Sequence, residues 1–466
     1  MNSLFNFQDK EEEKSPSRHF LDKMVSFGPK LAVYWNNQTY SYDEFLKLIN
    51  SWLVKLDQDG IQEGTVCAIY GDFSPQVCSL IFALIKKKAI IVPLTSDVTT
   101  EMDHLMSVAG AEYIYRFNNN DESILEKLQQ SAVPELVENF KHKKHAGLIV
   151  FTSGSTGKPK GILHDCELVM QKFLKPRSSW RTILFLLMDH FGGFNTFLSS
   201  FAYGGTAVCL SDRSPEGVVK TIEQSRANLL PTTPTFLNLM IAGRFFQNHD
   251  LSSIELITYG TEMMTPATLK AAAEIFPKAT LKQTYGMSEL GVLHSKSEDK
   301  NSLWVKVGGN GFETKVVDGI LWIKSESNMI GYLNAPNPFD EQGWLCTGDE
   351  VEQQGEFIKF KGRKSEIINV GGKKVFPSEV ENVILNASNI KDVTVFAKNH
   401  PLMGQVVHAR ITTIEPEESM PLTERLRKHC NEHLAKYKVP VRFIFTSLDE
   451  SHHNARFKKD RLKSDV

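Results

Sequence analysis

Glycines, hydroxyls and two lysines alternate in residues 152–161, which read Thr-Ser-Gly-Ser-Thr-Gly-Lys-Pro-Lys-Gly. The stretch follows an apolar run at 148–151 that predicts a strand. Glycines let backbone N–H groups approach an anion closely, while hydroxyls and lysines add donors and positive charge. The composition therefore predicts a polyphosphate-binding loop. A flexible turn is the alternative, and a Walker A loop is excluded because Thr152 stands where that pattern needs Gly.

The bulk composition is that of an ordinary globular protein. The 466 residues are 41% hydrophobic and 23% charged, enough for about three domains of usual size. Lys and Arg number 53 and Asp and Glu 55, and the resulting net charge of −2 indicates neither a nucleic-acid nor an anionic-membrane surface. Six scattered cysteines, a polar N-terminus and short apolar runs favour a soluble cytoplasmic protein without a membrane span.

Strand and helix signals alternate around the loop. Ser41 and Glu44 form an S-x-x-E capping box before a helix that Gly60 ends. A strand at 66–70, a helix opened by Pro75 and a strand at 90–92 make a strand–helix–strand unit. Further strand-like runs occur at 148–151, 206–210 and 256–259, each before a stretch that can be helical. This order predicts an α/β fold with parallel sheets covered by helices.

The pattern changes toward the C-terminus. After about Gly308 the expected strands are shorter, as at 319–324 and 356–360. From Arg363 a mixed α+β tail is expected, with a helix at 378–385, a strand at 393–397 and a helix that carries Leu426, Cys430 and Leu434. The chain therefore divides into an N-terminal domain, residues 1–362, and a C-terminal domain, residues 363–466.

Several ordered motifs resemble one family. The loop T-S-G-S-T-G-x-P-K-G closely resembles the phosphate-binding signature of the adenylate-forming superfamily: acyl-CoA synthetases, carrier-protein-loading adenylation enzymes and luciferases. Residues 283–289, QTYGMSE, resemble its Y-G-x-[ST]-E motif, and residues 344–349, WLCTGD, its T-G-D motif. Gly362-Arg363 and residues 371–381 resemble the start of its C-terminal domain. The resemblance spans roughly residues 35 to 461 and implies a large domain that includes a distorted barrel subdomain, followed by a small mobile domain.

The resemblance implies an ATP site. Tyr285 would lie against adenine, Asp349 would bond the ribose hydroxyls, and Glu289 would hold Mg²⁺. One carboxylate can accept from both hydroxyls of a diol, and Mg²⁺ prefers hard oxygen ligands. The alternatives are a core aromatic, a turn residue and a surface acid, respectively. The predicted nucleotide-binding residues are Thr152, Ser153, Gly154, Ser155, Thr156, Gly157, Lys160, Gly260, Thr261, Glu262, Thr284, Tyr285, Gly286, Ser288, Asp349 and Arg363.

A catalytic lysine is expected near the C-terminus. Attack of a carboxylate on the α-phosphorus of ATP brings two anions together, and unit charges at ~4 Å repel by about 4 kcal/mol at an effective dielectric near 20. The family's G-K-x-x-R setting is matched by Phe457-Lys458-Lys459-Asp460-Arg461, in which Phe457 replaces Gly. Lys458 is the catalytic candidate; Lys459 and a solvated basic tail are the alternatives.

The acid site is expected around residues 188–194. Met-Asp-His-Phe-Gly-Gly-Phe resembles the H-x-x-G element of fatty-acyl, aryl and coumaroyl members, and His190 is assigned to the pocket or to catalysis, with a packed structural histidine as the alternative. Asp189 leaves an ammonium partner open. Thr261 stands where a second Gly is common, which favours a small or flat acid. The predicted acyl pocket consists of His190, Phe191, Phe194, Tyr259, Gly286 and Met287.

The transfer step needs a hinge and a channel. Ser365 takes the hinge position, where relatives commonly have Asp or Lys, and a small polar residue can absorb a backbone rotation. Gly371 and Gly372 would let a pantetheine chain pass, although a simple turn explains them almost as well.

The resemblance implies ATP-dependent formation of an acyl-adenylate with release of pyrophosphate, then transfer to a thiol, that of coenzyme A in the first instance. The alternatives are a stand-alone adenylation enzyme that loads a carrier-protein phosphopantetheine or an amine, a luciferase-type oxidation of the adenylate, and a non-catalytic nucleotide-binding relative.

Overall fold

The computed structural model describes residues 15–96, 101–129, 132–153, 159–293, 295–298, 302–309, 311–446, 459 and 461. The chain folds into two compact units. Unit 1 consists of Met1–Ser211, Met287–Val292 and Ser327–Asn337. Unit 2 consists of Asp212–Gly286, Leu293–Glu326 and Pro338–Val466.

Unit 1 is built on a mixed seven-stranded sheet with the order β20-β8-β7-β4-β3-β5-β6. The central strands β5, β3, β4 and β7 are parallel, whereas β6, β8 and β20 run antiparallel to their neighbours. The strands are β3 (Val66–Tyr70), β4 (Ile90–Leu94), β5 (Tyr113–Phe117), β6 (Ser123–Lys127), β7 (Gly147–Ser153), β8 (Pro159–Asp165) and β20 (Gly331–Tyr332). A second group of strands joins β9, β10 and β1 in parallel and adds β2 antiparallel to β1. Their bounds are β1 (Leu31–Trp35), β2 (Gln38–Ser41), β9 (Arg181–Ile183) and β10 (Thr206–Val208).

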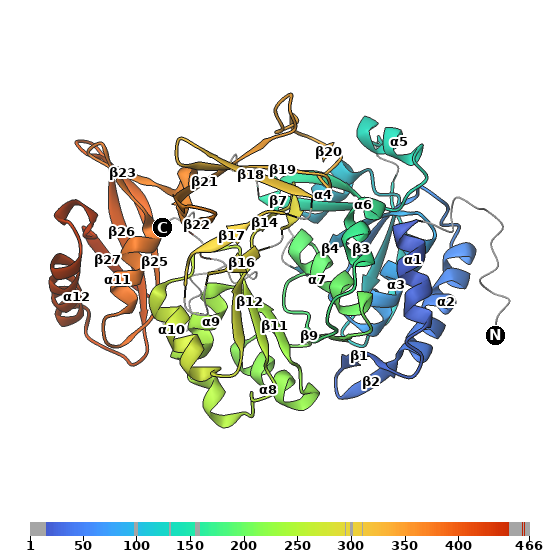
Figure 1. Cartoon of the computed structure of the whole chain (residues 1–466), viewed down its shortest axis with the longest axis horizontal. Helices are drawn as coiled ribbons and strands as arrows, with labels where there is room; N and C mark the ends of the chain where they lie inside the picture. Colours follow the sequence, from blue (N-terminus) through green and yellow to red (C-terminus); the bar gives the residue numbers. More distant parts are fainter. Residues whose placement is uncertain are drawn as a thin grey trace. The chain divides into compact units, whose positions relative to one another are not determined.

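The helices of unit 1 begin where the sequence places caps. Ser41 accepts a hydrogen bond from the backbone N–H of Glu44, and the Glu44 side chain accepts one from the N–H of Ser41, so the predicted capping box is present. Helix α3 begins at Pro75, as predicted. Helices α1, α2 and α3 pack together beside the sheet (Figure 1). The helices are α1 (Pro16–Val25), α2 (Tyr42–Gln58), α3 (Pro75–Lys86), α4 (Met102–Ala109), α5 (Glu135–Lys141), α6 (Cys166–Gln171) and α7 (Phe191–Ala202).

One element of unit 1 differs from expectation. The strand predicted at 148–151 is β7, but a second strand follows it, where the sequence analysis expected a stretch that can be helical. That strand, β8, pairs antiparallel with β7 from Gly147↔Asp165 to Ser153↔Pro159. The short apolar run within β8 has no helical period to separate it from a strand, and pairing with β7 and β20 decides the outcome.

The described part of unit 2 contains a parallel group of three strands and two further sheets. A parallel group joins β11 (Leu229–Thr232), β12 (Leu256–Tyr259) and β13 (Thr280–Gln283). A six-stranded antiparallel sheet, the curled half-barrel expected from the family resemblance, has the order β16-β17-β22-β21-β19-β18. Its strands are β16 (Ser295–Ser297), β17 (Val305–Val307), β18 (Phe312–Val317), β19 (Ile320–Ser325), β21 (Leu345–Gln354) and β22 (Phe357–Arg363). The helices beside the parallel group are α8 (Pro215–Ser225), α9 (Pro234–Ala242) and α10 (Pro266–Ile275). The short strands β14 (Gly286–Met287) and β15 (Gly291–Val292) follow β13 in the chain.

The C-terminal part of unit 2 has a core of its own. Its sheet runs β24-β23-β26-β25, with β27 parallel to β26, and α11 and α12 lie beside it (Figure 1). Val375, Val380, Ile411 and Leu426 are among the residues buried there. The second predicted helix is α12, but it ends at His433, so Leu434 is its extended C-cap residue and not part of it. The elements are β23 (Ile368–Val370), β24 (Lys373–Val375), α11 (Pro377–Leu385), β25 (Ile390–His400), β26 (Gly404–Thr413), α12 (Ser419–His433) and β27 (Arg442–Phe445).

Among the described residues, no helix has both the length and the apolar character needed to cross a bilayer.

Candidate functional site

Lys160, Tyr332 and Glu289 come together in unit 1. Lys160 lies on β8, and the pair Tyr332↔Ile162 places Tyr332 diagonally from it on the neighbouring strand β20. The Lys160 ammonium lies 5.1 Å from the centroid of the Tyr332 ring, a cation–π contact. The Tyr332 hydroxyl donates to Glu289 Oε1 at 2.7 Å. The lysine after the glycine-rich stretch and the predicted metal-binding acid therefore share one aromatic neighbour.

Backbone contacts hold this group in place. Met329 N–H donates to the carbonyl of Glu289 at 2.9 Å, which fixes the segment that carries the acid. The Asn334 side chain accepts from Gly161 N–H and donates to the carbonyl of Pro159, both at 3.0 Å. Neither Tyr332 nor Asn334 was predicted from the sequence.

The electrostatics of Tyr332 keep its hydroxyl protonated. Burial, and then the charge and hydrogen bond of Glu289, raise the pKa of Tyr332 far above its usual value. The phenol therefore remains a donor at neutral pH, and it orients a carboxylate whose Oε2 provides a hard oxygen of the kind that Mg²⁺ prefers. The residues present fit a magnesium ion bound by Glu289.

Part of the predicted phosphate loop lies outside the described residues, namely Gly154, Ser155, Thr156 and Gly157. Thr152 pairs with Lys160, and Ser153 pairs with Pro159, where β7 and β8 approach the loop. The loop is thus entered and left by two antiparallel strands.

A second group forms in unit 2 around Asp349. Tyr285 donates its hydroxyl to Asp349 Oδ2 at 2.5 Å, and Arg363 Nε donates to Asp349 Oδ1 at 3.1 Å. Asp349 and Arg363 are direct partners on β21 and β22, which explains the ion pair. Burial, and then the charge of Asp349, raise the pKa of Tyr285 well above its usual value. Each carboxylate oxygen keeps a second acceptor position, so the arrangement is compatible with the bonds to ribose hydroxyls that the sequence predicts.

The Tyr285 ring is also part of the packing. It stacks on Phe360 of β22 with ring centroids 4.8 Å apart and an interplanar angle of 14°. One face of the ring is therefore covered by protein. The adenine contact predicted for Tyr285 stays a prediction.

The carboxyl ends of β12 and β13 bring two predicted segments together. Tyr259 and Gln283 are register partners, and Thr284 donates both its backbone N–H and its hydroxyl to the carbonyl of Tyr259, at 2.8 and 3.1 Å. A Cβ on Gly260 would lie 2.6 Å from the carbonyl oxygen of Thr284, so the close approach requires glycine.

The next two residues have distinct environments. Thr261 has a φ of 70°, a left-handed conformation that glycine adopts without strain and a β-branched residue does not. Glu262 uses both carboxylate oxygens within the protein: Oε2 accepts from Thr235 N–H at the start of α9, at 3.2 Å, and Oε1 accepts from Lys459 N–H at 2.7 Å.

Of the other predicted nucleotide-site residues, Gly286 is exposed and Ser288 buried, and Met287, assigned to the acyl pocket, is half-buried.

The predicted acyl element forms the start of α7. His190 is the N-cap residue, and its Nδ1 accepts from Gly192 N–H at 3.3 Å, which leaves the hydrogen on Nε2. Asp189 is buried and accepts from the Thr95 hydroxyl at 2.8 Å. Phe191 and Phe194 are buried too, and the Phe194 ring lies 5.8 Å from that of Phe197. The roles assigned to His190, Phe191, Phe194 and Tyr259 at an acid stay predictions.

His164 on β8 is a residue that the sequence analysis missed. It is 1% exposed, its ring centroid lies 4.5 Å from that of Phe191, and its Nε2 has no hydrogen-bond partner among the residues that the structure describes. Burial lowers the pKa of His164 to about 3, so the imidazole is neutral. A lone histidine in an apolar run provides no sequence signal for this placement.

The tail is anchored by its two described residues, Lys459 and Arg461. Lys459 Nζ donates to Asp392 Oδ1 at 2.7 Å and to the carbonyl of Val393, and Arg461 donates to Glu381 at 3.0 Å. Burial would lower the pKa of Lys459, but the carboxylates of Asp392 and Glu381 outweigh it and raise that pKa. The predicted catalytic residue Lys458 lies outside the described residues.

The predicted hinge and channel residues are at the surface. Ser365 is exposed in the short 3₁₀ segment Lys364–Glu366, directly after β22. Gly371 and Gly372 have φ of 54° and 80° and form the two-residue turn between β23 and β24. This turn accounts for both glycines, and their part in a thiol channel stays a prediction.

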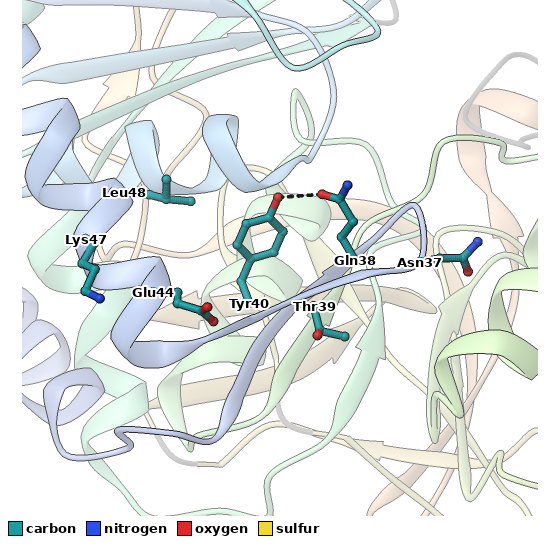
Figure 2. A pocket seen from close by; sticks show the side chains of 7 residues that line it. All are labelled: Asn37, Gln38, Thr39, Tyr40, Glu44, Lys47 and Leu48. Carbon is teal, nitrogen blue, oxygen red and sulfur yellow. Dashed lines mark hydrogen bonds between the residues drawn. The ribbon is translucent and has the colours of Figure 1, made fainter.

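A surface hollow of about 610 Å³ lies elsewhere in unit 1, over the β2 strand and the start of α2 (Figure 2). Tyr40 donates to Gln38 within it at 3.0 Å. None of the predicted site residues lines it, so it has no part in the site described above.

Comparisons with known proteins bear on this arrangement. The family model of the AMP-binding enzyme matches residues 21–333, and that of the AMP-binding enzyme C-terminal domain matches residues 379–456. The 2-succinylbenzoate–CoA ligase of Bacillus pumilus is 26% identical over 93% of this chain and 95% of its own length. The long-chain-fatty-acid–CoA ligase FadD13 of Mycobacterium tuberculosis is 25% identical over 91% and 93%. The ATP-bound structure of MatB from Rhodopseudomonas palustris shares the fold, with a TM-score of 0.79, 19% identity and coverage of 95% and 96%. The chain belongs to the AMP-binding enzyme family of the adenylate-forming superfamily.

Proposed function

We propose that the chain uses ATP to convert a carboxylic acid into an acyl-adenylate and then transfers the acyl group to the thiol of coenzyme A. The observation that carries this proposal is the contact series from Lys160 through Tyr332 to Glu289, next to the predicted phosphate loop. It links Lys160, a cation that can bind phosphate oxygens, to the Glu289 carboxylate, whose orientation the Tyr332 hydroxyl fixes. Membership of the AMP-binding family and similarity to two CoA ligases over at least 91% of this chain support the same activity.

The first step joins the acid to AMP. A carboxylate oxygen attacks the α-phosphorus, the new O–P bond forms, and the bond to pyrophosphate breaks. Lys458 and Lys160 reduce the repulsion between the two anions, and Asp349 holds the ribose. Mg²⁺ at Glu289 would neutralise charge on the phosphate oxygens. In the second step the thiol sulfur attacks the acyl carbon, the thiol proton is lost, and AMP leaves.

We place the boundary between the two domains after residue 362. The residues that follow β22 build a sheet with a separate core, which supports a small C-terminal domain. Among the hydrogen bonds that cross this boundary, Asn238 donates to the carbonyl of Lys391 at 2.9 Å, and Lys459 N–H donates to Glu262. A rotation about Ser365 between the two steps would have to break both.

The experiment is a pyrophosphate-release screen followed by an acceptor assay. The acids begin with those in the relatives' names, 2-succinylbenzoate and long-chain fatty acids, and extend to other aryl and amino acids. Adenylate formed from the active acid is then offered coenzyme A, an amine or a phosphopantetheinylated carrier protein. We expect acyl-CoA. Failure with coenzyme A and success with an amine or carrier protein would overturn the thiol assignment, while leaving adenylation intact.

A further inference from the structure

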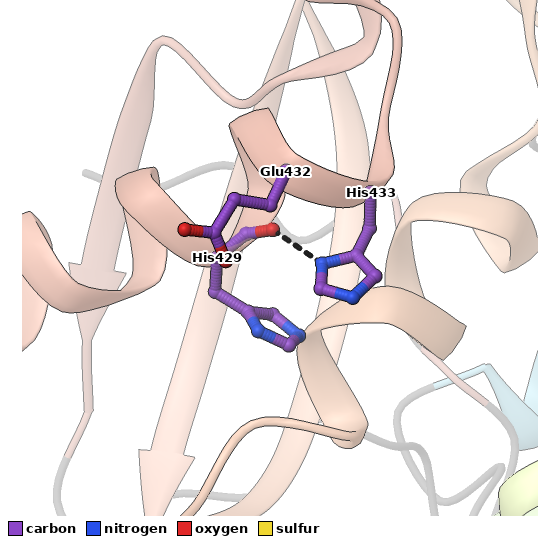
Figure 3. A group of neighbouring side chains, drawn as sticks. All are labelled: His429, Glu432 and His433. Carbon is purple, nitrogen blue, oxygen red and sulfur yellow. Dashed lines mark hydrogen bonds between the residues drawn. The ribbon is translucent and has the colours of Figure 1, made fainter.

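Three candidate metal ligands lie on one face of α12, outside the site described above. His429, Glu432 and His433 are spaced i, i+3 and i+4, so their side chains lie on the same side of the helix (Figure 3). One ligand atom from each residue lies within 4.8 Å of the others. Glu432 and His433 are exposed and His429 is half-buried, so the cluster is accessible to an ion from solvent.

Backbone carbonyls fix the tautomer of both imidazoles in their neutral form. His429 Nε2 lies 2.9 Å from the carbonyl oxygen of Val383, which can only accept, so Nε2 must carry the hydrogen. His433 Nδ1 lies 2.8 Å from the carbonyl oxygen of His429, and the same argument gives it the hydrogen. The lone pairs therefore remain on Nδ1 of His429 and Nε2 of His433.

This is the arrangement that metal-binding histidines usually have. A ligating imidazole typically donates its other N–H to a carbonyl or carboxylate, which fixes both the tautomer and the ring orientation. Here each ring lies within hydrogen-bond distance of one backbone carbonyl, and the ring centroids lie 4.5 Å apart. Metal binding therefore requires less ordering of the His429 and His433 side chains.

We propose that His429, Glu432 and His433 form a Zn²⁺ site in which a water completes the coordination. Two imidazole nitrogens and one carboxylate oxygen are a usual ligand set for Zn²⁺, and three protein ligands leave a fourth position for water. Mg²⁺ prefers oxygen ligands, so this set does not favour it. Because His429 donates to a carbonyl of α11, the bound ion also strengthens the contact between α11 and α12.

The test is a calorimetric titration of the untagged, metal-free full chain with Zn²⁺. The buffer contains excess Mg²⁺ and no ATP. The excess Mg²⁺ serves to keep Zn²⁺ from binding at the proposed magnesium site at Glu289. We expect one Zn²⁺ per chain, with affinity lowered at least about tenfold by His433→Ala and by Glu432→Gln. Both residues are exposed, so neither change removes core packing.

The matched control is the double variant His104→Ala/His142→Ala, which removes two exposed histidines elsewhere. It should bind Zn²⁺ like the unchanged chain. Equal Zn²⁺ binding by the unchanged chain and His433→Ala, or loss of binding in the control, would overturn the proposal. The readout does not involve adenylation, so it is independent of the proposed function.

Discussion

The buried Lys459–Asp392 pair predicts that the adjacent lysines 458 and 459 have separable roles. The two side chains are 11% and 3% exposed, and their nitrogen–oxygen distance is 2.7 Å. Lys459→Met removes the cation and leaves the Asp392 carboxylate buried. Such a change typically lowers the free energy of unfolding by about 3–5 kcal/mol. We expect a loss of about 3 kcal/mol here, because Val393 N–H still donates to Asp392. Detachment of the tail in this variant would expose Asp392 to water and make the loss of unfolding free energy smaller. Lys458→Ala should lower pyrophosphate release by orders of magnitude.

Unfolding in urea is monitored by far-UV circular dichroism. Pyrophosphate release is measured for the same variants. Lys398→Met, an exposed lysine on the strand that carries Asp392, is the control and should stay within about 0.5 kcal/mol of the unchanged chain. An unchanged unfolding free energy for Lys459→Met would refute the argument from burial. If folded Lys459→Met loses adenylation while Lys458→Ala retains it, the catalytic role belongs to Lys459.

Three further predictions rest on single side chains. Tyr332→Phe removes the hydrogen bond that orients Glu289 and should raise the Mg²⁺ concentration for half-maximal pyrophosphate release about tenfold; an unchanged titration would contradict this. Burial lowers the pKa of His164 in the folded chain. As the pH falls below about 6.5, this histidine therefore takes up a proton in the unfolded chain but not in the folded chain, and the free energy of unfolding decreases. At pH 5 this loss is about 2 kcal/mol, and His164→Phe should reduce the difference in unfolding free energy between pH 7.5 and 5 by that amount; an equal difference in both proteins would count against it. Thr261→Gly relieves a left-handed conformation and should leave the unfolding free energy unchanged or raise it by up to about 1 kcal/mol, whereas a clear decrease would show that Thr261 makes a stabilising contact.

Local signals predicted much of the fold. The strand expected at 256–259 has those bounds, and the capping box at Ser41 forms with both of its hydrogen bonds. These features depend on neighbours within a few residues, so a single sequence contains them. The antiparallel strand β8 depends instead on its partners in the sheet, and the sequence did not separate it from a helix.

The candidate site shows the same division. The resemblance of motifs to the family singled out Glu289, Asp349 and Lys160 as candidates, and their roles stay predictions. It could not identify Tyr332, because this residue lies on a two-residue strand about 170 positions after Lys160 in the chain. Nor could it show that Gly260 is required by the carbonyl of Thr284, a contact made only when two parallel strands align. Long-range register therefore completes the site.

Acid-dependent exchange of labelled pyrophosphate into ATP, measured without any acceptor, tests adenylation most directly. It reports the reversible first step alone, in which carboxylate and ATP give acyl-adenylate and pyrophosphate. We predict exchange that requires one class of carboxylic acid and Mg²⁺ and that Glu289→Gln strongly reduces. Absence of exchange across the fatty, aryl and amino acids, with ATP bound, would contradict the account.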